Sequence, residues 1–297
     1  MKFFDFVIRQ YNKFVAIPLV RKKLKDITIL DSMTSIQYII DNGCSVSRFG
    51  DGEFDVIMGG SEGYTRPDAR LAASLKHVLM STDAPNHIVG IPLPMKGISG
   101  LRPLSRDFWG FFVKNNIDRI LPLLSKNRTY IDTQLSRFYI AYTDKSNCAK
   151  HVELLRRIWD GRDIVIVEGT QSRTGVGNDL YDNAKSLKRI LGPAKDAFDV
   201  YDKMLNAITS NVSKNQLILM SYGPCATILA YDLAKLGFQA IDLGHLDIEY
   251  EWFRTGATTA TAVKGKFTNE AESEGGHIVD DCHDEEYLSQ IICDITK

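Results

Sequence analysis

The sequence predicts an α/β protein of the Rossmann-like type, with a mostly parallel sheet and helices on both faces. Strand-like and helix-like segments alternate along the chain, which is the pattern of strands joined by crossover helices. Two of the strand-like segments, 163–169 and 216–221, are continuous apolar runs, as expected of parallel strands that are buried on both faces. With 297 residues, of which 44% are hydrophobic, the chain is long enough to bury a large core.

The individual elements follow from local periodicity and from glycine and proline punctuation. Strands are expected at 44–49, 87–94, 128–133, 163–169, 216–221 and 239–244. Helices are expected at 70–81, 108–124, 149–161, 179–192, 197–211 and 225–237. Gly161 is expected to end its helix in the manner of a glycine just past the last turn. No internal repeat or low-complexity linker interrupts the alternation.

Charge and cysteine content exclude several classes of protein. The formal net charge is −1, so no overall basic field favours nucleic acid. The five cysteines have no CxxC spacing, which suits free thiols in a reducing cytoplasm and disfavours zinc; they are Cys44, Cys148, Cys225, Cys282 and Cys293. The sequence shows no signal peptide and no apolar run that approaches the roughly 20 residues of a membrane span. We therefore expect a cytoplasmic protein.

Residues 1–30 are predicted to form a separate N-terminal segment that is amphipathic and basic. Apolar residues recur there at helical spacing, and the basic run from Arg21 to Lys25 follows them. One interpretation is a helix packed on the domain or on a partner subunit of a homo-oligomer. The other is peripheral contact with an anionic membrane surface, at the inner face of the membrane. Residues 31–297 are expected to be a single domain, with a C-terminal extension from about residue 256.

Ligands of parallel α/β sheets bind at the carboxyl ends of strands, so the loops that follow the strands are the candidate site. The loop Glu168–Asp179 follows a buried strand, and its glycines can bring backbone amides close to a phosphate. Arg173 is the expected counter-charge for a pyrophosphate. The alternative is an ordinary glycine-rich connection in which Asp179 is a helix N-cap. The loop Ser221–Thr227 follows the next strand, and its Tyr222 is a candidate for stacking on a base or for the core. The donor-binding candidates in the two loops are Glu168, Ser172, Arg173, Gly175, Asn178, Asp179, Ser221, Tyr222 and Gly223.

Two carboxylates, Asp51 and Glu53, stand among glycines at the end of the first predicted strand. A loop that places both on one side suits a hard divalent cation such as Mg²⁺ or Mn²⁺, which takes oxygen ligands. Such a cation neutralises a departing nucleoside diphosphate. The alternative is that the two acids are turn and first-turn helix residues. Arg48, just upstream, is expected to meet a carboxylate or a phosphate in the same site.

The segment 242–253 follows the last predicted strand and alternates polar with apolar residues. This alternation places His245, Asp247, Glu249 and Glu251 on one face. An Asp or Glu there is a candidate general base for a sugar hydroxyl, and His245 a candidate contact for diphosphate or metal. The catalytic candidates are therefore Asp247, Glu249 and His245, with Asp247 first. The alternatives are a structural histidine and a solvated acidic face.

The motifs "RFGDGE", "EGTQSRTGVGNDL" and "SYGPCATILAYDLAKLGFQAIDLGHLDIEYEW" together resemble the GT-D-type glycosyltransferases. That family was first catalogued as a domain of unknown function in bacterial adhesin-glycosylation and surface-polysaccharide loci. The resemblance runs from about residue 30 to about residue 255. It implies a Rossmann-like GT-D fold and transfer of a hexose, typically glucose, from a UDP-sugar to a glycan acceptor. Carried over, the family's metal-binding Asp-x-Glu motif falls on Asp51 and Glu53.

The function predicted from these observations is metal-assisted transfer from a UDP-sugar to a bacterial surface glycoprotein or polysaccharide. Mn²⁺ or Mg²⁺ is the expected cofactor. Two other classes stay open: a nucleotide-sugar binding module without turnover, and a metal-dependent phosphohydrolase. The segment after about residue 255 carries no motif that assigns it a role.

Overall fold

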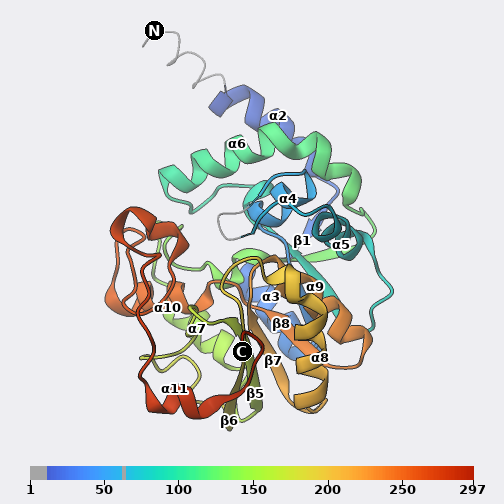
Figure 1. The fold of residues 1–297 in the computed structure, drawn as a ribbon. Coiled ribbons are helices and arrows are strands. Elements are labelled where there is room, and N and C mark those ends of the chain that lie inside the picture. Colours follow the sequence, from blue (N-terminus) through green and yellow to red (C-terminus); the bar gives the residue numbers. More distant parts are fainter. Residues whose placement is uncertain (1–11, 62–64) are drawn as a thin grey trace.

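The computed structural model describes residues 12–61 and 65–297, and over these residues the chain builds one parallel sheet (Figure 1). The strand order in the described residues is β1-β4-β3-β2-β8-β7-β5-β6-β9. The strands are β1 (Thr28–Ile29), β2 (Ser45–Arg48), β3 (His87–Ile91), β4 (Thr129–Asp132), β5 (Asp163–Gly169), β6 (Ser186–Gly192), β7 (Leu217–Ser221), β8 (Gln239–Asp242) and β9 (Ile291–Asp294). The predicted fold class is confirmed.

Strands β2 and β8 are neighbours at the middle of the sheet although they are far apart in the sequence. Val46 of β2 pairs with Ile241 of β8. On one side of this junction the order runs through β3, β4 and β1, and on the other side through β7, β5, β6 and β9. Connections leave such a junction in opposite directions, which opens a crevice at the carboxyl ends of the strands.

Helices cover both faces of the sheet, as the apolar strands require. Ile164 and Ile166 of β5 belong to the cluster that includes α3, α7 and α10, whereas Val165 and Val167 belong to the cluster of α8 and α9. Strand β5 is therefore buried on both sides. The helices are α2 (Ile17–Arg21), α3 (Ser32–Asn42), α4 (Asp51–Ile57), α5 (Ala69–Met80), α6 (Pro103–Ile120), α7 (Cys148–Arg156), α8 (Tyr201–Asn211), α9 (Pro224–Lys235), α10 (Leu246–Thr255) and α11 (Glu285–Gln290).

Shorter helical turns join these elements. A π-helical turn at Asn12–Ala16 leads into α2. The 3₁₀ turns are Lys22–Leu24, Leu93–Met95, Leu121–Leu123, Thr133–Ser136, Ala197–Val200 and Asn269–Glu274. The turns Thr133–Ser136 and Asn269–Glu274 both lead to the pocket described below.

Two local predictions are wrong. The helix predicted at 179–192 is instead a series of turns followed by strand β6. Seven residue pairs join β6 to β5, and this long-range pairing overrides the local helical pattern. The alternating segment 242–253 is not extended after β8 but forms helix α10. Its alternation arises because the first five residues of the helix are all buried, apolar ones in the core and acids in polar contacts.

The two ends of the described chain lie on different parts of the molecule (Figure 1). The N-terminal helical segment 12–24 packs against α6, where the side chain of Ile17 lies directly over Gly110. Residues 1–11 of the predicted basic segment lie outside the described residues. The C-terminal extension returns to the pocket at Phe267 and then adds β9 to the edge of the sheet. Among the described helices, none has the length and apolar character that crossing a membrane requires.

Candidate active site

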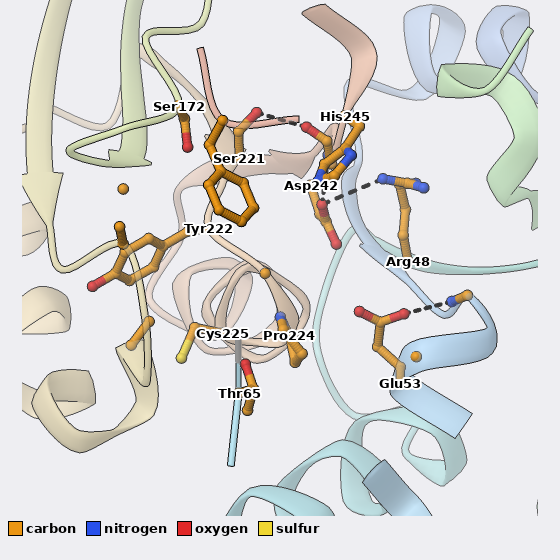
Figure 2. Close-up of a pocket in the computed structure, with 18 of the residues that line it drawn as sticks. Arg48, Glu53, Thr65, Ser172, Ser221, Tyr222, Pro224, Cys225, Asp242 and His245 are labelled. Atoms are coloured by element: carbon orange, nitrogen blue, oxygen red, sulfur yellow. Dashed lines mark hydrogen bonds and ion pairs between the residues drawn. The ribbon is translucent and has the colours of Figure 1, made fainter. Parts of the chain in front are cut away.

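A pocket opens at the carboxyl edge of the sheet, where the structure brings together most of the loops that the sequence singled out (Figure 2). Its walls come from the residues that follow β2, β4, β5, β6, β7 and β8, together with Phe267 of the C-terminal extension. Of the residues predicted to form the site, those lining it are Arg48, Asp51, Glu53, Ser172, Ser221, Tyr222, Gly223, His245 and Asp247. Glu168, Arg173, Gly175, Asn178, Asp179 and Glu249 are not among the lining residues.

Asp51 and Glu53 lie in the first turn of α4, not in a free loop. The side chain of Glu53 accepts a hydrogen bond from the Gly50 amide at 2.7 Å and so caps the helix. The side chain of Asp51 is exposed toward the pocket, and the pocket walls around it partly desolvate the carboxylate. This desolvation raises the pKa of the Asp51 carboxyl, and the positive charge of Arg137 opposes the rise. The first-turn alternative is therefore right about the local structure, and both carboxylates still line the pocket.

Arg48 is fixed at the end of β2 by partners from β8 and α9. Its Nη1 atom lies 3.6 Å from Oδ1 of the buried Asp242. Burial raises the pKa of Asp242, and Arg48 lowers it. Gly244 has a φ of 53°, and a Cβ atom there would lie 2.1 Å from Nη1 of Arg48. Only glycine at this position leaves room for the guanidinium, which is thereby aimed into the pocket (Figure 2).

The N-terminus of α9 faces the same space. Gly223 precedes it with a φ of 55° and Pro224 is its first residue, so the helix begins directly at the pocket. Amides at a helix N-terminus and the helix dipole favour an anion. Tyr222 lines the pocket but is 3% exposed and packs in the core with Met204, which fits the core alternative better than an open stacking platform.

The glycine-rich loop after β5 is held by internal contacts, and no helix follows it. Glu168 is completely buried, where it pairs with Arg189 at 2.7 Å and accepts the Thr174 amide. The guanidinium of Arg173 donates to the carbonyl oxygens of Gly265 and Asp280. The side chain of Arg173 therefore contacts the C-terminal extension and does not line the pocket.

The rest of that loop contacts α10. The Gly175 amide and the Asn178 side chain both donate to Oδ1 of Asp247, at 2.9 and 2.7 Å. Asp179 accepts from the Tyr250 hydroxyl at 2.8 Å and lies 3.5 Å from a guanidinium nitrogen of Arg156. Asp179 caps no helix. These contacts tie the loop to α10, and none of the three loop residues lines the pocket.

The two acids of α10 predicted as bases are both engaged by donors. Besides the two bonds to its Oδ1, Asp247 accepts from the ammonium group of Lys266 at 2.6 Å through Oδ2. Glu249 is fully buried, and its Oε2 accepts the amides of Tyr139 and Ile140. Burial raises the pKa of Glu249, with Arg137 opposing the rise. The two acids do not share one face, because Asp247 contacts the loop after β5 and Lys266, whereas Glu249 contacts the backbone after β4.

His245 is the N-cap residue of α10, and it meets two charged groups that the sequence did not single out. Its Nδ1 atom lies 3.2 Å from Oε1 of Glu270 and 3.5 Å from Nη2 of Arg137. Arg137 and Glu270 pair directly at 2.5 Å. Arg137 follows β4. It could have been predicted by applying to the expected strand 128–133 the rule that ligands bind at the carboxyl ends of parallel strands. Nothing in the sequence near Glu270 points to the pocket, because a turn in the C-terminal extension brings it there.

The donor set fits a divalent cation that is shared with a ligand. Within residues 12–61 and 65–297, no group of three or more His, Cys, Asp or Glu side chains is arranged to hold a metal ion by itself. Mg²⁺ bound with a nucleotide keeps several waters and takes one or two carboxylates plus phosphate oxygens. Asp51 and Glu53, which both line the pocket, would be enough for that smaller requirement.

Comparison with known proteins gives concordant results. A sequence profile of the family described as "Glycosyltransferase GT-D fold" matches residues 46–271. A curated relative from Streptococcus gordonii, "Probable glycosyl transferase Gly", is 33% identical over 92% of this chain and 39% of its own length. "Glycosyltransferase GlyD" of Streptococcus pneumoniae serotype 4 is 33% identical over 97% of this chain and 35% of its own length. The chain thus spans less than half the length of both relatives.

Solved structures show the same fold. One, described as the highly conserved domain of unknown function 1792 with a distinct glycosyltransferase fold, has a TM-score of 0.87 at 36% identity, covering 95% of this chain and 99% of that one. Another, described as a new glycosyltransferase of this kind from Streptococcus sanguinis, has a TM-score of 0.84 at 33% identity, covering 90% of this chain and 99% of that one. In both cases the likeness extends over nearly the whole chain.

Proposed function

The chain belongs to the glycosyltransferase GT-D fold family, and on that premise we propose that it transfers a hexose, glucose in the first instance, from a UDP-sugar to a glycan acceptor. The acceptor in this proposal is a glycan of a bacterial surface glycoprotein or polysaccharide, and the reaction takes place in the cytoplasm.

One observation carries the proposal: the carboxylates of α4, the guanidinium of Arg48 and the N-terminus of α9 all line one pocket. A UDP-sugar needs such a combination, because its diphosphate is anionic and becomes the leaving group. The α9 N-terminus and Arg48 supply positive potential for the diphosphate. A divalent cation, when bound at Asp51 and Glu53, supplies further neutralisation of the leaving group.

The chain's own residues then divide the work. Asp242 holds Arg48 in place by its negative charge, and Gly244 leaves room for the guanidinium. Ser221 donates to the Gly244 carbonyl at 2.8 Å and so ties the loop after β7 to the loop after β8. The pocket is therefore prearranged for the diphosphate, which lowers the cost of ordering the site when the donor binds.

The outermost helices support a second part of the proposal, peripheral contact with an anionic membrane. On α2 and α6, Leu19, Leu104 and Phe108 are exposed, and the basic run containing Lys22 and Lys25 adjoins α2. Apolar side chains flanked by cations suit a membrane surface. Co-sedimentation with phosphatidylglycerol vesicles, and not with phosphatidylcholine vesicles, tests this, and Leu104→Asp should weaken it. A stable dimer in light scattering, without vesicle binding, would assign the face to a homo-oligomer.

The test of the main proposal compares two acids of α4. Asp51→Asn should lower Mn²⁺-dependent UDP release from UDP-glucose by about 10²-fold or more, because a metal that stabilises a leaving group contributes several kcal/mol. Asp55→Asn is the matched control: Asp55 is an exposed acid of the same helix but does not line the pocket, and its variant should keep wild-type turnover.

Three results would count against the proposal. Wild-type turnover of Asp51→Asn at limiting Mn²⁺ would remove the metal assignment. UDP binding without turnover on any acceptor would favour a binding module. Release of inorganic phosphate would favour the phosphohydrolase.

A further inference from the structure

His245 and Glu270 form a hydrogen-bonded pair at the pocket wall. Both carboxylate oxygens of Glu270 lie near Nδ1 of the imidazole, at 3.2 and 3.3 Å. A carboxylate can only accept, whereas the guanidinium of Arg137, whose Nη2 lies 3.5 Å from the same Nδ1, can only donate. The two contacts to Glu270 are shorter, so the favoured tautomer carries its proton on Nδ1. The opposite ring nitrogen, Nε2, then keeps its lone pair, and His245 lines the pocket.

We propose that His245 is the general base that deprotonates the acceptor hydroxyl and that Glu270 is the positioning residue that sets its tautomer. This inference rests on the proposed sugar transfer. In the step, Nε2 takes the hydroxyl proton and the oxygen's electron pair forms the new bond to the anomeric carbon. The bond from that carbon to the diphosphate oxygen breaks, and its electrons leave with UDP. The imidazolium that results lies beside the Glu270 carboxylate.

The carboxylates near the pocket are less suited to this role. Asp247 accepts from three donors, one of them an ammonium group, so both of its carboxylate oxygens are already engaged. Glu249 is fully buried and accepts two backbone amides. Asp51 and Glu53 belong to the proposed cation site. His245 instead has one nitrogen held by a carboxylate and is only partly buried.

The charges around the ring are compatible with this role. Burial works against ionisation of Glu270, but Arg137 and His245 hold the pKa of its carboxyl well below the usual range, so it stays anionic. Arg137 also faces Glu249 at 3.8 Å, and its charge acts on Asp51 of α4. Arg48 lies against Gly244, the residue before His245, and is paired with Asp242. Glu270 is thus the carboxylate that directly contacts the imidazole.

The C-terminal extension is folded so as to present Glu270. The Thr268 amide donates to the Gly276 carbonyl at 2.8 Å, and the Gly276 amide donates to the Ala271 carbonyl at 2.9 Å. A Cβ atom at Gly276 would lie 2.4 Å from the Thr268 carbonyl oxygen, so the turn requires glycine. Lys266 anchors the same turn to Asp247. This arrangement gives the extension a catalytic task that its sequence did not indicate.

The test separates positioning from folding by measuring the pH dependence of UDP release from UDP-glucose, with water or a glycan as acceptor. His245→Gln should lose turnover by about 10²–10⁴-fold while UDP affinity stays within a few fold. Glu270→Gln should lower the plateau and move the acid limb of the profile to lower pH, because the imidazolium loses its counter-charge. Asp281→Asn, which removes an exposed carboxylate of the same extension, should leave the limb in place.

An independent readout is the tautomer of His245 from ¹⁵N shifts of its ring nitrogens. We expect the Nδ1–H form in the wild type and a mixture in Glu270→Gln. An unmoved acid limb together with an unchanged tautomer would overturn the inference even if UDP binds normally. Failure of the wild-type protein to bind UDP and Mn²⁺ would instead contradict the proposed function.

Discussion

Two Asp-x-Glu pairs, Asp51/Glu53 and Asp247/Glu249, lie in the first turns of helices that follow neighbouring parallel strands, yet their surroundings are opposite. The pair on α4 follows β2 and lines the pocket with both side chains. The pair on α10 follows β8, and each of its acids is buried among donors. Sequence spacing is the same in both.

The difference comes from partners that are remote in the sequence. Lys266 and the loop containing Gly175 and Asn178 converge on Asp247, and the backbone after β4 supplies amides to Glu249. Around α4, the capping bond to Glu53 is local and spans three residues. A carboxylate pair can therefore be a ligand site or a structural anchor, and the long-range donors decide which.

The largest effect that this comparison predicts is on stability. Asp247→Ala removes the closer of two carboxylates that pair with the buried Lys266, 4% exposed, and leaves it only Glu251 at 3.5 Å. It should reduce the free energy of unfolding by about 3–5 kcal/mol. Asp51→Ala, at an exposed first-turn position, should change it by no more than about 1 kcal/mol. Urea denaturation of the two variants measures both values. Equal losses of unfolding free energy in the two variants would contradict the contrast between the two carboxylate pairs.

A smaller, pH-dependent effect distinguishes Glu249. Its pKa in the folded protein is raised, by burial, above the unfolded value. Such a group contributes stability below its unfolded pKa and loses that contribution as the pH rises through the folded pKa. Glu249→Gln should therefore be more destabilising near pH 4 than near pH 7. Urea midpoints of the wild type and the variant at the two pH values check this. A difference between them that is larger at pH 7 than at pH 4 would contradict the raised pKa of Glu249.

Much of the fold could be predicted from the sequence because it depends on local signals. The continuous apolar runs of β5 and β7 and the glycines after β2 and β7 marked the sheet and the edge where the pocket lies. Strand β6 was missed because its pairing with β5, not its own pattern, determines its structure. The edge strands were also missed: β1 is only two residues long, and β9 lies in the C-terminal extension, where no pattern was recognised.

The site could be predicted only where residues follow a strand directly. Arg48, Asp51 and Glu53 meet that condition, and the structure places all three at the pocket. Arg173 also lies in a strand-end loop, but its side chain turns toward the carbonyls of Gly265 and Asp280. Glu270 reaches the pocket through a turn that is specified by Gly276, far from any strand end. Residue spacing alone predicts neither the direction of a side chain nor which distant segment folds back to the pocket.

The measurement that bears most directly on the central claim is the affinity for UDP by calorimetry, with and without Mn²⁺. In the wild type and in Asp55→Asn, Mn²⁺ should increase UDP affinity, because a cation held by Asp51 and Glu53 would neutralise charge on the diphosphate. In Asp51→Asn that increase should disappear while the fold stays intact. An equal Mn²⁺-dependent increase in Asp51→Asn would contradict the account, since the cation would then be held elsewhere.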